Sequence, residues 1–274
     1  MTRYSRYARA LVLLASFLFV ASPLVAQETD DDHAKLRPAE PDFVLVNLPT
    51  TLPLPVLGGN FRLTHRFAGN LANQSFSEAA SNLFGLDQGA VVGLEYRIGV
   101  MKHLEAAVYR TSFDKTFQFY GKYDAMHQSD RNFVGISGLV SIEGADNFQE
   151  RYAPALGATV SRTFPGDRVA LYAVPMWVHN TAAILNQDRD TFWMGFGGRV
   201  RLLESTYVTA EVTPRLAGYA PGEAEYGFSI EKRVGGHYFS LTFTNTFSST
   251  FAQVARGGQQ DTLYLGFNLA RKFF

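Results

Sequence analysis

The final thirteen residues, 262–274, alternate apolar side chains with small or polar ones. They have the sequence TLYLGFNLARKFF and end on two aromatic residues. Successive side chains of a β-strand point to opposite faces, so a strand that separates lipid from a wet interior repeats with period two. The segment therefore predicts the closing strand of a transmembrane β-barrel, and no other feature of the sequence constrains the fold as strongly.

Further segments upstream alternate in the same way. They predict an all-β fold, an antiparallel transmembrane β-barrel of about 12 strands over residues 60–274. Each segment has about the 9 to 11 residues that a tilted strand needs to cross a membrane, or slightly fewer. The expected strands are 60–67, 90–98, 103–112, 115–126, 133–143, 153–163, 169–180, 191–202, 206–215, 224–232, 237–247 and 262–274. Because 103–126 and 127–152 can be divided differently, counts from about ten to fourteen fit the pattern.

The composition fits such a barrel and excludes other classes. Mean hydropathy is −0.06, as expected where the apolar belt faces outward and the interior is polar. The 23 Phe, 13 Tyr and 24 Gly favour short strands. Charge is balanced, with 25 basic and 25 acidic residues, which gives no general attraction to nucleic acid. The absence of cysteine excludes disulfides and thiolate metal sites. We expect no cofactor and no metal site, because the acidic loop residues lack the spacing of a known calcium loop.

The first residues predict a secretory signal peptide over 1–26. Arg3, Arg6 and Arg9 precede an apolar stretch, and small residues lead to an expected cleavage after Ala26. The apolar stretch is shorter than the roughly 20 residues that a membrane-spanning helix needs.

Residues 27–59 predict a Pro-rich periplasmic lead. Prolines at 38, 41, 49, 53 and 55 remove backbone donors and disfavour both helix and ladder. The run 43–48, FVLVNL, is too apolar for a free linker. The sequence leaves open whether the lead is disordered, docks against the barrel mouth or enters the lumen.

The connections between the expected strands alternate short with long from the sixth onward. Tight periplasmic turns and larger outer loops have this asymmetry, which predicts that both termini lie in the periplasm. We expect the bacterial outer membrane as the location. The expected partners are outer-membrane lipid and the barrel assembly machinery during biogenesis, with no nucleic acid.

The charged residues of the strands fall almost always on the phase opposite to the apolar one. In 224–232, for example, Tyr226, Phe228 and Ile230 alternate with positions that include Glu225 and Glu231. A charge at the bilayer midplane costs roughly 2 to 4 kcal/mol, so the charged phase is assigned to the lumen. The predicted lumen-facing charges, a candidate pore lining, are Arg62, Arg66, Glu95, Arg97, Glu105, Lys122, Asp124, Glu143, Arg199, Arg201, Glu211, Arg215, Glu225 and Glu231.

Several local features are less regular. Strand 169–180 is apolar on both faces and contains Pro175, so its facing stays open and a bulge is expected there. The outward phase of the last strand ends on Phe273, not on the terminal residue. Residues 75–83 predict a short helix in position to cover the mouth. The glycine pairs at 197–198, 235–236 and 257–258 are interpreted as bends and turns.

Five runs of sequence are distinctive: NLPTTLPLP (47–55), YRTSFDKTFQFYGKYD (109–124), YAVPMWVHN (172–180), EKRVGGHYF (231–239) and LYLGFNLARKF (263–273). Together they resemble a family of bacterial β-barrel proteins catalogued as a domain of unknown function. The resemblance covers nearly all of the chain after residue 26. It implies an outer-membrane barrel and no assigned catalytic or ligand residues.

Two functional hypotheses follow. In the first, the lumen charges line a passive channel for small solutes. In the second, they are paired in a closed structural or surface-binding barrel without transport, with the narrow lumen blocked by side chains or by 27–59. A lipid-modifying enzyme is a distant third hypothesis, and we expect no enzyme: His237 and Ser240 are the nearest His–Ser pair, but their odd separation places them on opposite faces of a strand.

Overall fold

The computed structural model describes residues 39–129, 131–181 and 189–274. The expected signal peptide and residues 27–38 of the expected lead lie outside these ranges. In the described part, no helix is long and apolar enough to span a membrane. The strands are β1 (Gly59–Asn70), β2 (Ala90–Met101), β3 (Leu104–Thr111), β4 (Phe117–Met126), β5 (Gly135–Gly144), β6 (Glu150–Thr163), β7 (Val169–Val178), β8 (Thr191–Leu203), β9 (Thr206–Thr213), β10 (Arg215–Gly218), β11 (Glu225–Val234), β12 (His237–Thr244) and β13 (Tyr264–Phe273). The short helices are α2 (Phe76–Ser81), η1 (Leu83–Gln88), η2 (Phe113–Lys115), α3 (Ala145–Phe148) and α4 (Phe251–Ala255).

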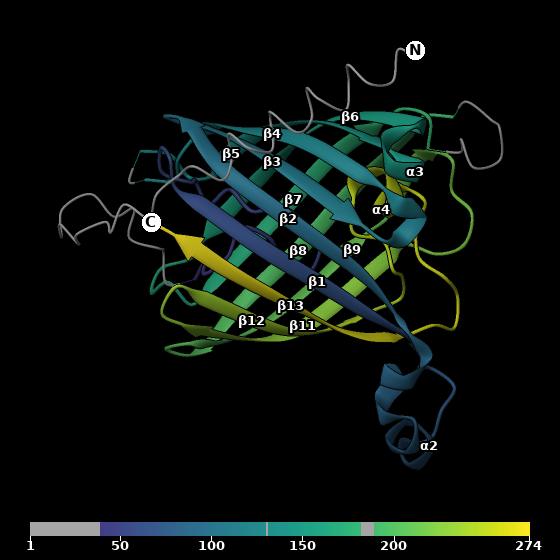
Figure 1. Ribbon diagram of the computed structural model, residues 1–274. Coiled ribbons are helices and arrows are strands. Elements are labelled where there is room, and N and C mark those ends of the chain that lie inside the picture. The colour runs from purple at the N-terminus through teal and green to yellow at the C-terminus, as the bar shows by residue number, and fades with distance from the viewer. Residues whose placement is uncertain (1–38, 130, 182–188) are drawn as a thin grey trace, which may run out of the picture. The chain divides into compact units, whose positions relative to one another are not determined.

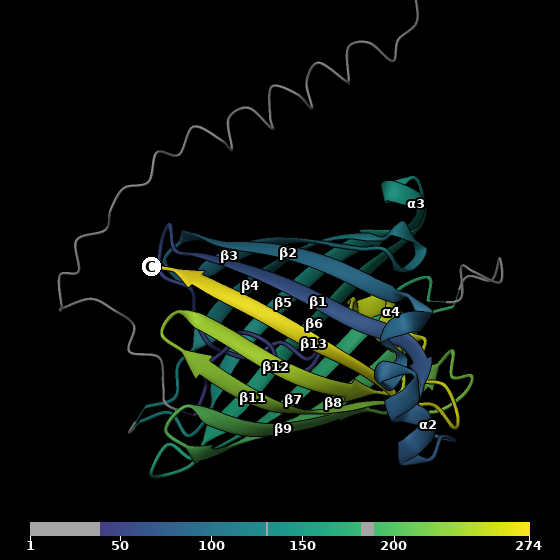
Figure 2. The same ribbon diagram turned by 60° about the horizontal axis from the view of Figure 1, so that its bottom comes forward.

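Twelve of these strands form a closed antiparallel ring. Each pairs with its neighbours along the chain, β1 pairs with β13, and β9 pairs with both β8 and β11 (Figures 1 and 2). β10 continues β9 beyond Pro214: Arg215 pairs with Trp193 in the register in which Val212 pairs with Phe196. Closure leaves no unpaired edge among the twelve strands. The predicted fold class, an antiparallel barrel of about twelve strands, is confirmed.

The barrel has two different rims. The C-terminal rim carries the start of β1, the end of β13 and the connections β2–β3, β4–β5, β6–β7, β8–β9 and β11–β12. The other connections lie at the opposite end, which we call the loop rim. Gly59 at the start of β1 pairs with Phe273 at the end of β13. The barrel domain therefore begins and ends at the same rim.

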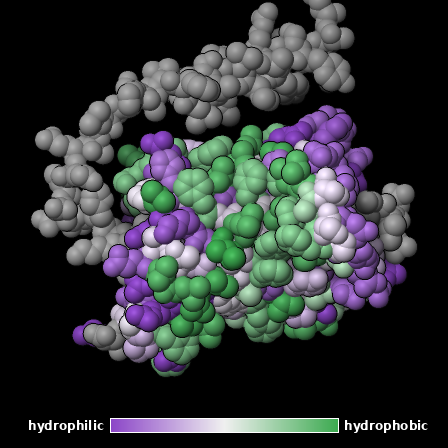
Figure 3. Space-filling model, turned by 90° about the horizontal axis from the view of Figure 1, so that it is seen from below, coloured by the Kyte–Doolittle hydropathy of each residue, from purple (hydrophilic) through white to green (hydrophobic). Residues whose placement is uncertain are grey.

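The polarity of the barrel is inverted relative to a soluble protein. Along β11, Glu225 and Glu231 are buried inside the ring, whereas Tyr226, Phe228 and Ile230 are exposed outside. Figure 3 shows a band of hydrophobic side chains between two hydrophilic ends. The outward side chains thus form the apolar belt that a bilayer requires.

β7 is the strand whose facing the sequence leaves open. Its inward side chains, Tyr172, Val174 and Met176 among them, are buried, and α4 lies against this strand inside the ring. Pro175 is on the outward phase and pairs with Met194 in a register that runs unbroken along β7. The expected bulge in β7 is therefore wrong. The strand is apolar on both faces because one faces outward and the other faces protein inside the lumen.

The predicted helix at 75–83 begins with a capping box. Ser75 accepts from the backbone N–H of Glu78, and the Glu78 carboxylate accepts from the Ser75 backbone. The Ser75 hydroxyl also donates to the Glu78 carboxylate (2.6 Å), and this bond, together with the one from the Ser75 backbone N–H, lowers the pKa of Glu78. Figure 1 shows α2 projecting from the loop rim. The segment that enters the lumen from this rim is α4.

The belt can be tested at Ile230, which is 57% exposed in the middle of β11. Ile230→Arg places a charge in the lipid and is expected to lower the free energy of unfolding by about 2 to 4 kcal/mol. Denaturant titration of the protein folded into lipid vesicles measures this loss, with Ile230→Leu as the control. Equal stability of the two variants would contradict the assignment of this face to lipid.

Candidate functional site

The segment that precedes β1 lies inside the ring of strands. We call residues 39–58 the plug segment; residues 39–52 are all buried. In Figures 1 and 2 its purple trace runs behind the front strands, within the barrel. The Leu45 N–H donates to the Leu48 carbonyl (2.8 Å) and the Thr50 N–H donates to the Phe43 carbonyl (2.9 Å). Residues 43–50 thus form a tight reversal of the chain, whose tip is 46–48.

Glu211, on β9, holds this tip. Its carboxylate accepts from the backbone N–H groups of Val46 (3.0 Å), Asn47 (2.8 Å) and Leu48 (3.1 Å). The Asn47 side chain donates to Glu225 on β11 (2.8 Å). One carboxylate of the wall thus satisfies three backbone donors that a chain reversal would otherwise leave unpaired.

Basic residues of the wall bind the carbonyl groups of the plug segment. Lys122, on β4, donates to the carbonyl oxygens of Thr50 (3.1 Å) and Leu52 (2.6 Å). Arg199, on β8, donates to that of Val44 (2.8 Å). The acidic wall residue binds N–H groups and the basic ones bind carbonyls, so the charge pattern of the wall matches the backbone polarity of the segment.

The ring of Phe43 lies among cations. The Arg97 guanidinium and the Lys272 ammonium are each 5.1 Å from its centroid, and the Lys122 ammonium is 5.9 Å away. A cation over an aromatic face is attracted by the ring quadrupole, more strongly where water is excluded. The first residue of the FVLVNL run is therefore an anchor of the plug segment.

An ion-pair ladder crosses the wall beside this ring. Arg97 pairs with Glu95 (2.8 Å) and Glu105 (3.1 Å), Arg62 pairs with Glu95 (3.4 Å), and Lys122 pairs with Glu105 (3.3 Å). The side chains of all five are at most 3% exposed. Burial of single charges would be costly, and alternation of sign along the ladder offsets that cost.

Glycines of β8 make room for the plug segment. A Cβ at Gly197 would overlap Cδ1 of Leu45, and a Cβ at Gly195 would lie 2.6 Å from Cδ2 of Leu48. Residues 197 and 198 pair with β9 in unbroken register. The interpretation of Gly197 and Gly198 as a bend is therefore wrong: they belong to a regular strand, and Gly197 lacks a side chain where Leu45 inserts.

A second segment fills the lumen near the loop rim. All five residues of α4 are buried. The Ala252 N–H donates to Glu143 (3.0 Å), and the Phe251 ring lies 5.6 Å from that of Tyr120. Buried residues of α4, the inward face of β7 and the plug residues Leu45 and Leu48 form one apolar cluster. The lumen is thus filled from both rims, with an apolar centre that the two segments share.

The structure places most of the predicted lumen charges inside the ring. Twelve of the fourteen are buried, and Arg201 and Arg215 are half-buried near the rims. Arg215 donates to the carbonyls of Pro221 and Arg256, so it ties loops together. The role of these charges as a pore lining stays a prediction. The sequence reasoning missed α4, for which the only signal was the two-sided apolar character of β7.

His237 and Ser240, the pair considered for the enzyme hypothesis, do not form a site in the structure. His237 is exposed outside the ring, whereas Ser240 is 2% exposed and faces the lumen. At the loop rim, His179 and Asp190 form an exposed pair (Nδ1 to Oδ1, 2.6 Å). Neither arrangement brings a nucleophile and a base together.

The fold and the polarity of its surfaces define a membrane β-barrel. The chain belongs to the membrane bound beta barrel domain family (DUF5777), whose model matches residues 43–273. The matched range includes the tip of the plug segment as well as every strand. No curated protein matches the chain.

Solved porin structures share the fold. The KdgM porin is similar with a TM-score of 0.50 and 7% identity, over 80% of this chain and 100% of that one. The KdgM porin in complex with disordered oligogalacturonate has a TM-score of 0.51 and 7% identity, again over 80% of this chain and 100% of that one. The NanC porin has a TM-score of 0.50 and 6% identity, over 79% of this chain and 99% of that one. At such identities the likeness concerns the fold alone.

The hydrogen bonds between Glu211 and the tip of the plug segment can be tested with a cysteine reporter, because the chain has no cysteine of its own. A Val46→Cys reporter, buried in the lumen, is expected to react slowly with a water-soluble maleimide. Adding Glu211→Ala leaves three backbone donors unpaired and is expected to speed labelling by about tenfold or more. Glu204→Ala, which removes an exposed carboxylate at the C-terminal rim, is the control. Unchanged labelling in the Glu211 variant would show that this carboxylate does not hold the tip.

The glycine contact generates a second prediction. Gly197→Val fills the space that Leu45 occupies and is expected to displace the plug segment, which raises labelling of the same reporter. Gly138→Val is the control, since nothing lies within 4 Å of a Cβ at that position. Circular dichroism checks that both variants form the barrel. Slow labelling in a folded Gly197→Val protein would contradict the proposed fit.

Proposed function

We propose that this protein is an outer-membrane barrel held closed at rest by its own N-terminal segment. The observation that carries the proposal is the capture of the tip of the plug segment by Glu211 through three backbone N–H groups. The lumen charges then serve as a docking surface for this segment. This function belongs to the second of the two hypotheses, a closed barrel.

The plug contacts are of a kind that can be exchanged for water. Hydrogen bonds between segment and wall contribute only about 0.5 to 1.5 kcal/mol each when water replaces them, and somewhat more at charged groups. The apolar cluster that includes Leu45 and Leu48 opposes release more strongly, because its burial is lost outright. Docking is therefore specific in geometry, and release of the segment requires its apolar side chains to leave the lumen as well as its hydrogen bonds to be exchanged for water.

A second candidate function is passive passage of small solutes once the segment has left. The fold likeness to the KdgM and NanC porins favours it, and the released wall would present acidic and basic side chains to water. Such a lining selects by size and charge. In this proposal the resting barrel is closed, and the plug segment and α4 determine when it conducts.

We assign the C-terminal rim to the periplasm. Its β2–β3, β8–β9 and β11–β12 connections have two residues each, and outer-membrane barrels have short periplasmic turns. The plug segment would then enter from the periplasmic side, from a chain exported by the expected signal peptide. Outer-membrane lipid and the assembly machinery are the partners that this location implies.

Planar-bilayer recording tests the proposal. The full-length mature chain is expected to show no conductance steps, and a variant that lacks residues 39–57 is expected to conduct. A variant in which 248–257 is also replaced by a short flexible linker should conduct more, because α4 no longer fills the loop side.

Each result decides between the candidates. Steady conductance of the intact chain would overturn the closed resting state. If neither truncated variant conducts, although circular dichroism shows that both barrels are folded, the closed barrel stands and the channel function is excluded.

A further inference from the structure

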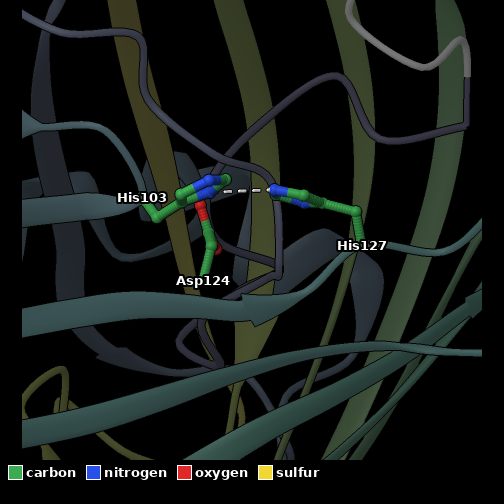
Figure 4. A group of neighbouring side chains, drawn as sticks. All are labelled: His103, Asp124 and His127. Carbon is green, nitrogen blue, oxygen red and sulfur yellow. Dashed lines mark hydrogen bonds between the residues drawn. The ribbon is translucent and has the colours of Figure 1, made fainter.

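Two histidines and an aspartate meet at the C-terminal rim, away from the contacts of the plug tip. His103 ends the β2–β3 turn, Asp124 lies near the end of β4, and His127 follows β4 (Figure 4). One donor atom from each residue lies within 4.8 Å of the other two. The two imidazoles approach most closely, with His127 Nε2 3.1 Å from His103 Nδ1.

This donor set matches the ligand chemistry of zinc. Imidazole nitrogen and carboxylate oxygen are both zinc ligands, with Zn–N distances of about 2.0 to 2.1 Å. Two nitrogens on a tetrahedral ion at that distance stand roughly 3.3 Å apart. The observed separation of 3.1 Å is therefore close to the spacing around a bound ion.

The fold holds the three residues in place. A register shift between Asp124 and Met126 interrupts the β4–β5 ladder. In a regular strand, Asp124 and His127 would lie on opposite faces because they are three residues apart. A bulge adds one residue, so the two side chains can lie on the same face. The Asp124 N–H donates to the His103 carbonyl (2.8 Å), which fixes the turn against β4.

A hydrogen bond from a neighbouring residue orients the carboxylate. The Ser137 hydroxyl donates to Asp124 Oδ1 (2.7 Å), and the Asn132 side chain donates to the backbone carbonyl of His127 (3.1 Å), which fixes the chain there. Outer-shell hydrogen bonds of this kind orient ligands in metal sites. Asp124 is 6% exposed, whereas His127 is exposed, so the carboxylate is anchored in the wall and the site is open to solvent on the histidine side.

We propose that His103, Asp124 and His127 bind one divalent transition-metal ion of the zinc class. Three protein ligands leave one position of a tetrahedral ion for water. A metal-free hydrogen bond between the two imidazoles accounts for the histidine contact alone. The proposal rests on the convergence of all three residues, since the Asp124 carboxylate also offers an oxygen within 4.8 Å of both imidazoles. The bound ion ties the β2–β3 turn to the end of β4.

Isothermal titration of the full-length mature chain with ZnCl₂ tests the site. The protein must carry no histidine tag. One ion is expected to bind per chain. His103→Ala, His127→Ala and Asp124→Asn are each expected to weaken binding at least tenfold, because the loss of an outer-shell partner alone costs about 10- to 100-fold in metal affinity. The control is His179→Ala, which removes the histidine of the His179–Asp190 pair at the loop rim, where the structure shows no second imidazole among the described residues.

Thermal unfolding provides a readout that does not depend on the calorimetric signal. An ion that binds the folded state raises the melting temperature. Zinc is expected to raise the melting temperature of the wild type and of His179→Ala, and to leave the melting temperature of His127→Ala unchanged. Absence of zinc binding to the wild type, equal binding by the folded His103 and His127 variants, or loss of binding in His179→Ala would each overturn the proposal.

Discussion

Every backbone N–H and C=O group in a bilayer needs a partner within the protein, because lipid offers none. The twelve-strand ring satisfies this requirement by pairing each strand on both sides, with β1 against β13 as the seam. Once the ring is closed, the outward side chains must be apolar because they face lipid, whereas the inward side chains can be polar or charged. The polar lumen and everything bound in it depend on this closure.

The interior of the ring then acquires its own core. Charges of the wall bind the backbone of the plug segment, with Glu211 on N–H groups and Lys122 on carbonyls. Apolar residues of the plug segment and of α4 meet β7 in the centre. Two segments far apart in sequence, residues 39–58 and residues 248–257 around α4, fill the lumen and make the difference between a hydrated barrel and a closed one.

Periodicity predicts the strands because each must match the bilayer locally, whatever its neighbours do. The penultimate strand is an example: Phe239 and Leu241 face outward, and Ser240 faces inward. The same reasoning fails at β7, where both faces are apolar, and at Gly197, which was interpreted as a bend. Both exceptions have one cause, the protein packed inside the lumen. The charged residues of the wall could be assigned to the lumen from their phase, but their partners there could not.

The sequence by itself determined the architecture, the inward placement of the charges and the membership of the belt, because alternation along a strand is a local property. Only the tertiary structure decided that residues 39–58 occupy the lumen, that α4 meets them from the other rim, and that His103 and His127 come together beside Asp124. The two histidines are 24 positions apart in the sequence, and the tip of the plug segment is 165 positions from Glu211. These arrangements arise from ring closure and a strand bulge, which set distances in space that no spacing along the chain encodes.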